Sequence, residues 1–419
     1  MKLKLLFAFL IFQVSFAQHR TCGMQEKMAQ IMSNPAQRQA YLDQQSKFQA
    51  ELQKISYNKN GNSVNTVIRI PVAVHFPAVA NTSTLKACFR TLAQSQINIL
   101  NADYNGANSD ISNYAADAPF YPGTNTGNMQ VEFVLATQNH PAGTGLVNGD
   151  LAVTFGTDFL GSNDNDATWA GYLNLVCRNA GSGILGYSNL GASPSAGDCV
   201  VISKASFGSG SGCTGYVPTA PYDLGRTLTH ELGHYFNLDH TFAGCGETNC
   251  AVYNASTPDG DGICDTPSQN VEDYNCPAAG SVAGCVGGEY ALTMNYLDYV
   301  DDACMYMFTA NQATRMLAWY NSIASQFRTN VLGNESFLKN DFSISPNPSK
   351  GSFTIQFKDV MNSYSVEVFD VTGKTIYENS YDQSANLSQA INLENTPSGV
   401  YFINIKSDKG IVTKKLVIE

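Results

Sequence analysis

Basic residues are scarce in this 419-residue chain, which has 24 Lys and Arg against 35 Asp and Glu and contains no basic run. The resulting net charge of −11 argues against nucleic acid as a partner. Charged residues of both signs make up only 14% of the chain, which suits a secreted protein better than a cytosolic one. After the amino-terminal residues no apolar stretch is long enough for a transmembrane helix, so the sequence predicts no transmembrane segment.

Cysteine is absent after Cys304, although the chain has 11 cysteines. Cys22 stands alone near the amino terminus, and the other ten lie between Cys88 and Cys304. Such a number fits an oxidising compartment, where ten central cysteines allow up to five disulfides. Cys22 is then the cysteine that needs another explanation.

The amino terminus predicts a secretory signal peptide at residues 1–17. Lys2 and Lys4 precede an apolar run, and Ala17 supplies a small residue for cleavage. The run is too short to be a membrane anchor. Residues 18–60 have helical apolar spacing followed by a polar loop, and we interpret them as short amphipathic helices of a removable prosegment.

Strand and helix patterns alternate in the central domain, residues 61–333, which predicts an α/β fold. From His240 to Tyr290 the pattern gives way to Gly, Asp, Asn, Pro and Cys, so a loop-rich lobe of this length needs disulfides or ions to hold its shape. Residues 334–341 form a linker, and residues 342–419 have the short alternating strands of a small β-sandwich. The expected central strands are residues 67–76, 131–136, 172–176 and 199–203, and the expected helices are residues 92–104, a helix from about Leu224, and residues 311–327.

Only six histidines occur in the chain, and three of them fall within residues 230–240. His230 and His234 lie four residues apart on one helix face, where both imidazoles can bind one zinc ion and Glu231 can hold a water molecule against it. His240 is too far round a continuing helix to join them, so the chain must turn sharply near Asn237, a residue type that tolerates left-handed geometry. A bare HExxH also occurs by chance on surface helices, and the third histidine makes this motif specific. Three ligands leave one position open, as in catalytic zinc sites.

Together with residues 294–316 and Thr266-Pro267, this motif resembles the pappalysin family of metzincin metalloendopeptidases, in its cytophagalysin-like branch. The resemblance covers about residues 67–330. It implies a metzincin-like zincin domain with an upper and a lower subdomain. The upper subdomain would have a twisted mixed sheet and the active-site helix, and the lower one would be loop-rich and cross-linked by disulfides. A small all-β sandwich would follow.

The resemblance also implies roles for single residues. His230, His234 and His240 would bind zinc, and Glu231 would act as general base and then as general acid. Tyr299 matches the tyrosine beside the metal, which binds zinc or stabilises the oxyanion; a core tyrosine is the alternative.

Two positions depart from the family pattern. Asn237 stands where a glycine is usual. Leu297 occupies the Met-turn position, where an apolar side chain forms a floor under the metal, and leucine has a similar volume to methionine. Met294 could reach the floor instead through a register shift.

Asp302 matches an acidic residue at the base of the S1′ pocket, which would favour Arg or Lys after the scissile bond. Asp298 and Asp301 are close enough in sequence to be confused with it.

The loop-rich lobe contains carboxylates that alternate with glycines, as in loops that bind calcium. The candidate calcium ligands are Asp259, Asp261, Asp265 and Thr266. A plain Asp-Gly turn is the alternative, and the resemblance favours calcium. The resemblance further suggests disulfides Cys276–Cys304 and Cys245–Cys285, while Cys250–Cys264 is a guess.

Cys22 follows Arg20-Thr21 and resembles a cysteine switch, whose thiolate fills the open zinc position of a latent enzyme. An unpaired or intermolecular thiol is the alternative. The carboxy-terminal sandwich resembles a type IX secretion sorting domain, through Ser345-Pro346-Asn347-Pro348 and the ending at residues 414–419. It implies export by the type IX secretion machinery through the periplasm and outer membrane, to a secreted or cell-surface location; a substrate-binding sandwich is the alternative.

The sequence therefore predicts a secreted, latent zinc endopeptidase that acts on proteins or peptides. The alternative is a non-catalytic cell-surface binding protein on a metzincin scaffold. The intact Glu231 beside three histidines argues against the alternative, because a protein without catalysis has no need for the base.

Overall fold

The computed structural model describes most of the chain from residue 20 onward. The described residues are 20–57, 67–81, 84–156, 158–159, 164–246, 260–332, 342–357, 363–370, 374–382, 387–393, 396–407 and 410–419. The predicted signal peptide, linker, Cys250 and Asp259 lie outside them. The chain forms two compact units, the first consisting of Met1–Ala136, His140–Leu146 and Leu151–Thr329 and the second of Thr137–Asn139, Val147–Asp150 and Asn330–Glu419.

A six-stranded mixed sheet forms the frame of the first unit. Strand β1 (Ile68–Phe76) lies in its middle and pairs in parallel with β2 (Val131–Leu135), β3 (Val153–Phe155) and β4 (Leu173–Cys177). Strand β6 (Cys199–Ile202) continues the sheet in parallel, and the two-residue β5 (Gly186–Tyr187) closes the edge in the antiparallel direction. Nearly all residues of β1 and β4 are buried, as expected for strands covered on both faces.

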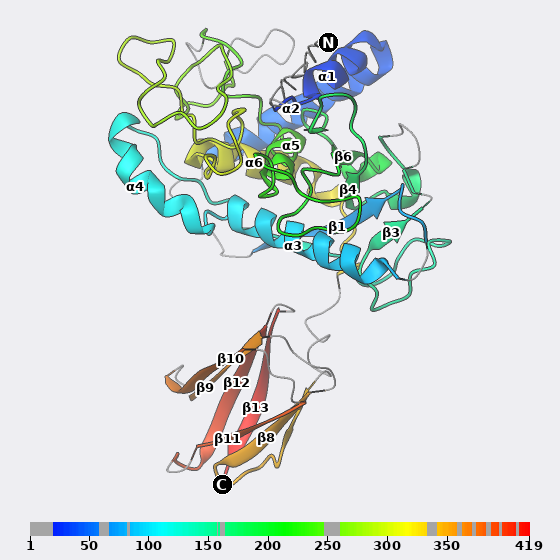
Figure 1. Cartoon of the computed structure of the whole chain (residues 1–419), viewed down its shortest axis with the longest axis vertical. Helices are drawn as coiled ribbons and strands as arrows, with labels where there is room; N and C mark the ends of the chain where they lie inside the picture. The colour runs from blue at the N-terminus through cyan, green and yellow to red at the C-terminus, as the bar shows by residue number, and fades with distance from the viewer. Residues whose placement is uncertain are drawn as a thin grey trace, which may run out of the picture. The chain divides into compact units, whose positions relative to one another are not determined.

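Three long helices of this unit pack with the sheet into one core, and Figure 1 labels them. They are α3 (Lys86–Tyr104), α5 (Arg226–Tyr235) and α6 (Ala310–Ile323). Helix α6 begins with a capping box, in which Thr309 accepts a hydrogen bond from the Gln312 backbone. The remaining short helices are α4 (Tyr114–Asp117) and the 3₁₀ turns Ser109–Asn113, Ala118–Phe120, Ala167–Trp169, Pro194–Ala196 and Ala324–Gln326.

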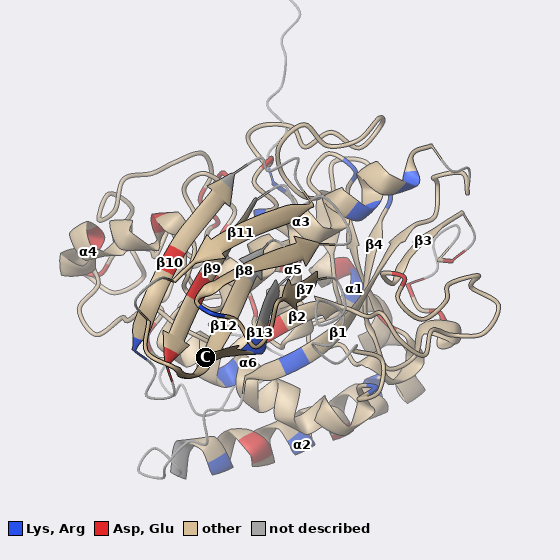
Figure 2. Cartoon of the chain, turned by 90° about the horizontal axis from the view of Figure 1, so that it is seen from below, with Lys and Arg blue, Asp and Glu red and all other residues tan. Residues whose placement is uncertain are grey.

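The amino-terminal region consists of α1 (Met24–Ser33) and α2 (Pro35–Tyr57). Helix α2 is one helix of 23 residues, as Figure 2 shows, so the expectation of short helices is wrong for this segment. No helix among those described combines the length and the apolar character needed to cross a membrane.

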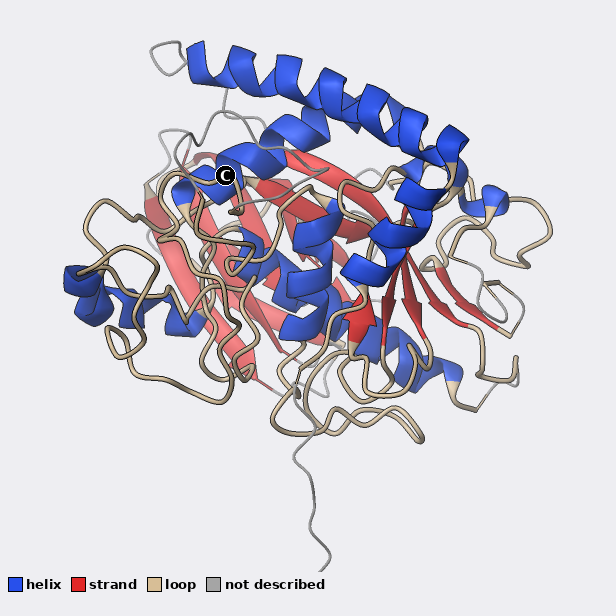
Figure 3. Ribbon diagram, turned by 90° about the horizontal axis from the view of Figure 1, so that it is seen from above, coloured by secondary structure: helices blue, strands red, loops and turns tan. Residues whose placement is uncertain are grey.

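The loop-rich lobe follows α5. Within residues 236–246 and 260–309 the chain forms neither helix nor strand, and long tan loops are prominent in Figure 3. Disulfides join Cys245 to Cys285 and Cys276 to Cys304, the two pairings that the resemblance implied. Cys264 is also disulfide-bonded.

Two of the ten central cysteines are not in disulfides. A third bridge joins Cys88 in α3 to Cys213, whereas Cys177 and Cys199 are free and buried in the sheet. The upper limit of five bridges is therefore not reached. The two thiols act as small apolar core groups in neighbouring strands.

The second unit is a β-sandwich of a four-stranded sheet, in the order β10-β9-β12-β13, and a three-stranded sheet, in the order β11-β8-β7. Apolar side chains from both sheets form its core. The strands are β7 (Phe342–Ser345), β8 (Ser352–Phe357), β9 (Ser363–Asp370), β10 (Thr375–Asp382), β11 (Ser388–Asn392), β12 (Gly399–Ser407) and β13 (Gly410–Ile418). The predicted fold class, an α/β domain followed by an all-β sandwich, is confirmed.

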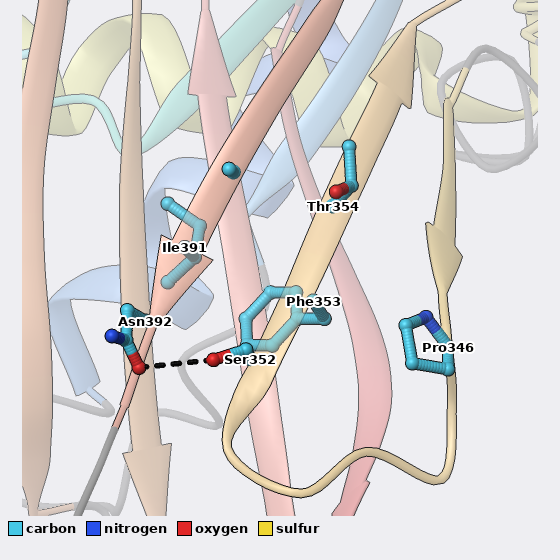
Figure 4. A pocket seen from close by; sticks show the side chains of 7 residues that line it. Pro346, Ser352, Phe353, Thr354, Ile391 and Asn392 are labelled. Carbon is cyan, nitrogen blue, oxygen red and sulfur yellow. Dashed lines mark hydrogen bonds between the residues drawn. The ribbon is translucent and has the colours of Figure 1, made fainter.

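One surface pocket of the sandwich lies over the end of β8, where Ser352 donates a hydrogen bond to Asn392 at 3.1 Å (Figure 4). Its lining residues are Pro346, Ser352, Phe353, Thr354, Ala390, Ile391 and Asn392. This lining has no Asp, Glu, His, Cys or Lys side chain.

Candidate metal centre

Helix α5 carries two of the three histidines, and every residue of the helix is buried. The Nε2 atoms of His230 and His234 lie 3.1 Å apart on one face. The helix then ends in a turn at Asn237, whose φ of 68° is left-handed. This turn brings His240 back, with its Nε2 atom 3.2 Å from that of His234, as the spacing predicted.

Backbone carbonyls fix the orientation of two imidazoles. His230 Nδ1 donates to the Tyr296 carbonyl and His234 Nδ1 to the Leu238 carbonyl, each at 2.7 Å. Burial lowers the pKa of both rings, so both are neutral and their Nε2 atoms present lone pairs. Lone pairs that converge in a buried site repel one another unless a cation lies among them, and a set of three imidazoles is the donor set of many catalytic zinc sites. The residues therefore fit a zinc ion.

Cys22 completes the cluster. Its Sγ atom and one nitrogen from each of the three histidines all lie within 4.8 Å of one another. Burial and the nearby Glu231 carboxylate raise the pKa of the Cys22 thiol. A bound cation reverses this balance, since a metal-binding thiol is deprotonated.

Glu231 lies next to the cluster, with its Oε2 atom 3.2 Å from Cys22 Sγ. Burial raises the pKa of this carboxyl group to about 8, while the Cys22 hydrogen bond and the Arg20 charge act in the opposite direction.

The edge strand β5 holds the segment around Cys22. Leu185 N donates to the Thr21 carbonyl and Gly23 N donates to the Gly186 carbonyl, both at 3.0 Å, so residues 21–23 run parallel to β5. A Cβ atom on Gly186 would lie 2.8 Å from Glu231 Cγ, so only glycine allows β5 to pass this close. The segment lies where an extended peptide would pair with the sheet edge.

Asp302 forms an ion pair with a side chain of the segment around Cys22. Arg20 forms an ion pair with its Oδ1 atom, and the side chains are 1% and 0% exposed. The Oδ2 atom accepts hydrogen bonds from the backbone N–H groups of Leu224 and Arg226, at 2.9 and 3.2 Å. Tyr222 covers the guanidinium at 5.0 Å. A buried, hydrogen-bonded carboxylate thus binds an arginine side chain of the chain itself.

Asp298 has a different environment. Its Oδ1 atom accepts from the backbone N–H groups of Asp273 and Tyr299, at 2.9 and 2.7 Å, and Gln269 donates to Oδ2 at 3.1 Å. Asp298 thus fixes the loop before Tyr299 and does not pair with Arg20.

Tyr299 lies beside the histidines, with its ring centroid 5.1 Å from that of His240 and 5.7 Å from that of His230. Its hydroxyl accepts a hydrogen bond from Cys22 N at 3.3 Å. Burial raises the pKa of Tyr299, so the phenol stays protonated and can donate.

Leu297 lies under α5. One of its methyl carbons would be 3.0 Å from a Cβ atom on Gly233, between the two helical histidines. Met294 belongs to a separate apolar cluster with Tyr121 and Met307. Of these two residues, Leu297 is the one that packs against α5, and its role as the apolar floor stays a prediction.

The structure pairs two of the described calcium candidates, Asp261 and Thr266, while the third, Asp265, contacts the start of α6. Asp261 accepts hydrogen bonds from the Thr266 hydroxyl, at 2.9 and 3.0 Å, whereas Asp265 accepts from Thr309 and from Asn311 N at the start of α6. Among the residues that the structure describes, the histidines and Cys22 form the only metal-binding group of three or more His, Cys, Asp and Glu side chains.

Two features of the site were missed from the sequence. Strand β5 is too short for a periodic pattern, and its Gly186 carried no signal. Arg20 was part of the segment assigned to the cysteine switch, and its position two residues before Cys22 matches the alternation of an extended strand.

Comparison with known proteins supports this description. Residues 215–321 match the family model described as pregnancy-associated plasma protein-A, and residues 343–419 match the secretion system C-terminal sorting domain. An extracellular metalloprotease of Colletotrichum graminicola is 36% identical over 157 residues, which are 36% of this chain and 50% of that protein. A second extracellular metalloprotease of this fungus is 27% identical over 74% of this chain and 93% of its own length.

A solved promirolysin variant from Tannerella forsythia is 28% identical, with a TM-score of 0.50 over 74% of this chain and 95% of that chain. The first curated relatives match this chain along no more than half of their own length. The sorting domain indicates export by type IX secretion, and the relatives are extracellular. With its three converging histidines, its metzincin-like fold and these relatives, the chain is similar to the pappalysin family of metalloendopeptidases, whose model matches residues 215–321.

Proposed function

We propose that the protein is a secreted zinc endopeptidase that is made as a latent precursor and hydrolyses peptide bonds in proteins. The observation that carries this proposal is the cluster of three histidine nitrogens and Cys22 Sγ within 4.8 Å, next to Glu231. When bound, zinc polarises a carbonyl group and lowers the pKa of a water molecule. The ligands would be His230, His234 and His240, with Cys22 as a fourth in the latent form.

Glu231 supplies the proton transfer. In the absence of the segment around Cys22, its carboxylate faces the space that Sγ fills in this structure. One carboxylate oxygen accepts a proton from the attacking water and then delivers it to the leaving amine nitrogen. The close passage of β5 at Gly186 holds an extended peptide beside this carboxylate.

Tyr299 stabilises the oxyanion. Its protonated hydroxyl contacts Cys22 N in the latent form, so release of the segment frees the hydroxyl to donate to a developing negative charge.

Asp302 sets a preference for Arg or Lys after the scissile bond. The support is the buried ion pair with Arg20, in which a guanidinium of the chain itself binds this carboxylate. A substrate cation in this pocket would replace Arg20 on the same carboxylate.

Latency follows from the same contacts. Residues 20–23 occupy the proposed metal position and the Asp302 pocket, and they pair with the sheet edge. Cleavage after the prosegment, residues 18–60, would release all three contacts together. The predicted boundaries at residues 17, 60, 333 and 341 are tested by sequencing the ends of the exported protein.

A structural calcium ion in the loop-rich lobe remains part of the proposal, with Asp261 as its central ligand. The run of carboxylates and glycines supports it, and Asp261 is 3% exposed. Because Asp265 already binds the start of α6, Asp261→Ala is the variant to compare. Calcium should raise the melting temperature of the parent and leave that variant unchanged; an unchanged parent indicates a plain Asp-Gly turn.

The proposed activity is tested on a broad substrate such as casein. Activated protein should cleave casein, lose activity with a zinc chelator and regain it with zinc. Glu231→Ala should bind zinc and lose cleavage. Cleavage that survives Glu231→Ala or chelation would contradict the mechanism, whereas activated protein that binds zinc and cleaves no casein would favour the non-catalytic binding protein.

A further inference from the structure

Helix α2 contributes a single buried face to the first unit. Three of its side chains are buried, namely Tyr41, Gln45 and Phe48, and the intervals of four and three residues place them on one side of the helix. Phe48 is fully buried and packs against Trp319 of α6, with ring centroids 5.7 Å apart. The guanidinium of Arg315 lies 5.0 Å over the same ring. The helix is thus part of the main core.

The same face of α2 binds the turn that precedes His240. Gln45 Nε2 donates to Asn237 Oδ1 at 2.8 Å, and Asn237 Nδ2 donates to Gln45 Oε1 at 3.1 Å. Arg315 Nε donates to the Asn237 carbonyl at 2.8 Å. Asn237 is 0% exposed, so each of its polar side-chain atoms depends on a protein partner, and Gln45 supplies a partner to both.

The turn decides where the third histidine lies. Asn237 stands three residues before His240 and has the left-handed conformation that reverses the chain. A conformation of this kind is unfavourable for a residue with a side chain, and it persists where the surroundings hold it. Side chains from α2 and α6 hold it here.

The contacts of α2 are separate from the contacts that residues 20–23 make at the metal centre. Residues 20–23 reach the histidines, Asp302 and β5, whereas the buried face of α2 meets α6 and the turn. We infer that α2 is a clamp that holds the turn at residues 236–240 in the conformation that directs His240 to the metal, with Gln45 as a positioning residue. The identity of the metal rests on the proposed function, while the clamp on the turn does not.

Hydrogen–deuterium exchange of the full-length chain tests the clamp. A Glu231→Ala background prevents self-cleavage, and peptides covering residues 236–241 are followed with and without zinc. Gln45→Ala removes both bonds to Asn237, and Gln45→Met removes them while keeping the side-chain volume. Gln44→Ala is the matched control, because Gln44 donates only to Ser322 Oγ, at 2.9 Å.

Both Gln45 variants should increase exchange at residues 236–241 about tenfold and leave β4 unchanged, and Gln44→Ala should match the parent. In zinc-loaded protein, both Gln45 variants should also transfer zinc to a chelator faster. In an Asn237→Gly background, Gln45→Ala should have no further effect, because its partner is gone. Equal exchange in the Gln45 and Gln44 variants would overturn the inference. A parent that binds no zinc would contradict the proposed function instead, and the exchange comparison would still decide on the clamp.

Discussion

The metal centre is built from two regions that hold their residues by different means. Helix α5 and its turn supply His230, Glu231, His234 and His240, which are fixed by helix geometry and by backbone carbonyls at 2.7 Å. The loop-rich lobe supplies Tyr299 and Asp302 without any helix or strand, and the Cys276–Cys304 disulfide closes the chain around them. Under the proposed function, this difference means that the helix region determines whether a reaction occurs, while the lobe adjusts its rate and its substrates.

The largest effect is expected in the helix region. His240→Ala removes one of three ligands, so zinc per chain should fall from one to near zero at micromolar zinc and casein cleavage should disappear. Metal analysis after gel filtration checks this. Retained zinc together with full activity would show that the turn does not contribute a ligand.

A smaller effect is expected from the tyrosine of the lobe. Tyr299→Phe keeps the ring and removes the donor to the oxyanion, so kcat should fall about a hundredfold with zinc still bound. The KM should change little, because the interaction is made mainly in the transition state. A rise in KM together with the fall in kcat would point to a structural tyrosine in the core.

The pocket of the lobe should change specificity more than rate. Asp302→Asn keeps the hydrogen bonds from Leu224 N and Arg226 N possible and removes the charge. The ratio of kcat/KM for peptides with Arg and with Ala after the scissile bond should fall about tenfold. An unchanged ratio would place the cation preference elsewhere.

The smallest effect concerns the floor under α5. Leu297→Met restores the usual family residue at similar volume, so the free energy of unfolding should change by less than about 1.5 kcal/mol. Chemical denaturation checks this, and kcat should stay within a few-fold of the parent. A large loss would mean that the shape of the floor controls the metal geometry.

The sequence predicted the parts of the molecule that depend on local periodicity. The histidines four residues apart needed only a helix, and the buried strands β1 and β4 needed only continuous apolar runs. The pairings Cys245–Cys285 and Cys276–Cys304 came from the family resemblance.

The remaining features depend on contacts between distant segments. Strand β5 has two residues and exists because β6 and residues 21–23 pair with it. The bond between Gln45 and Asn237 joins residues 192 positions apart. The histidine spacing marks a turn near Asn237, but no local pattern marks Gln45 as its partner. The same holds for Cys177 and Cys199, whose free state follows from their places in the sheet.

X-ray absorption at the zinc edge of the Glu231→Ala precursor tests the central claim most directly. We predict one zinc per chain with three nitrogen neighbours at about 2.0 Å and one sulfur neighbour at about 2.3 Å, and loss of the sulfur neighbour in a Cys22→Ser variant. A precursor without zinc, or one whose zinc lacks the histidine nitrogens, would contradict the account.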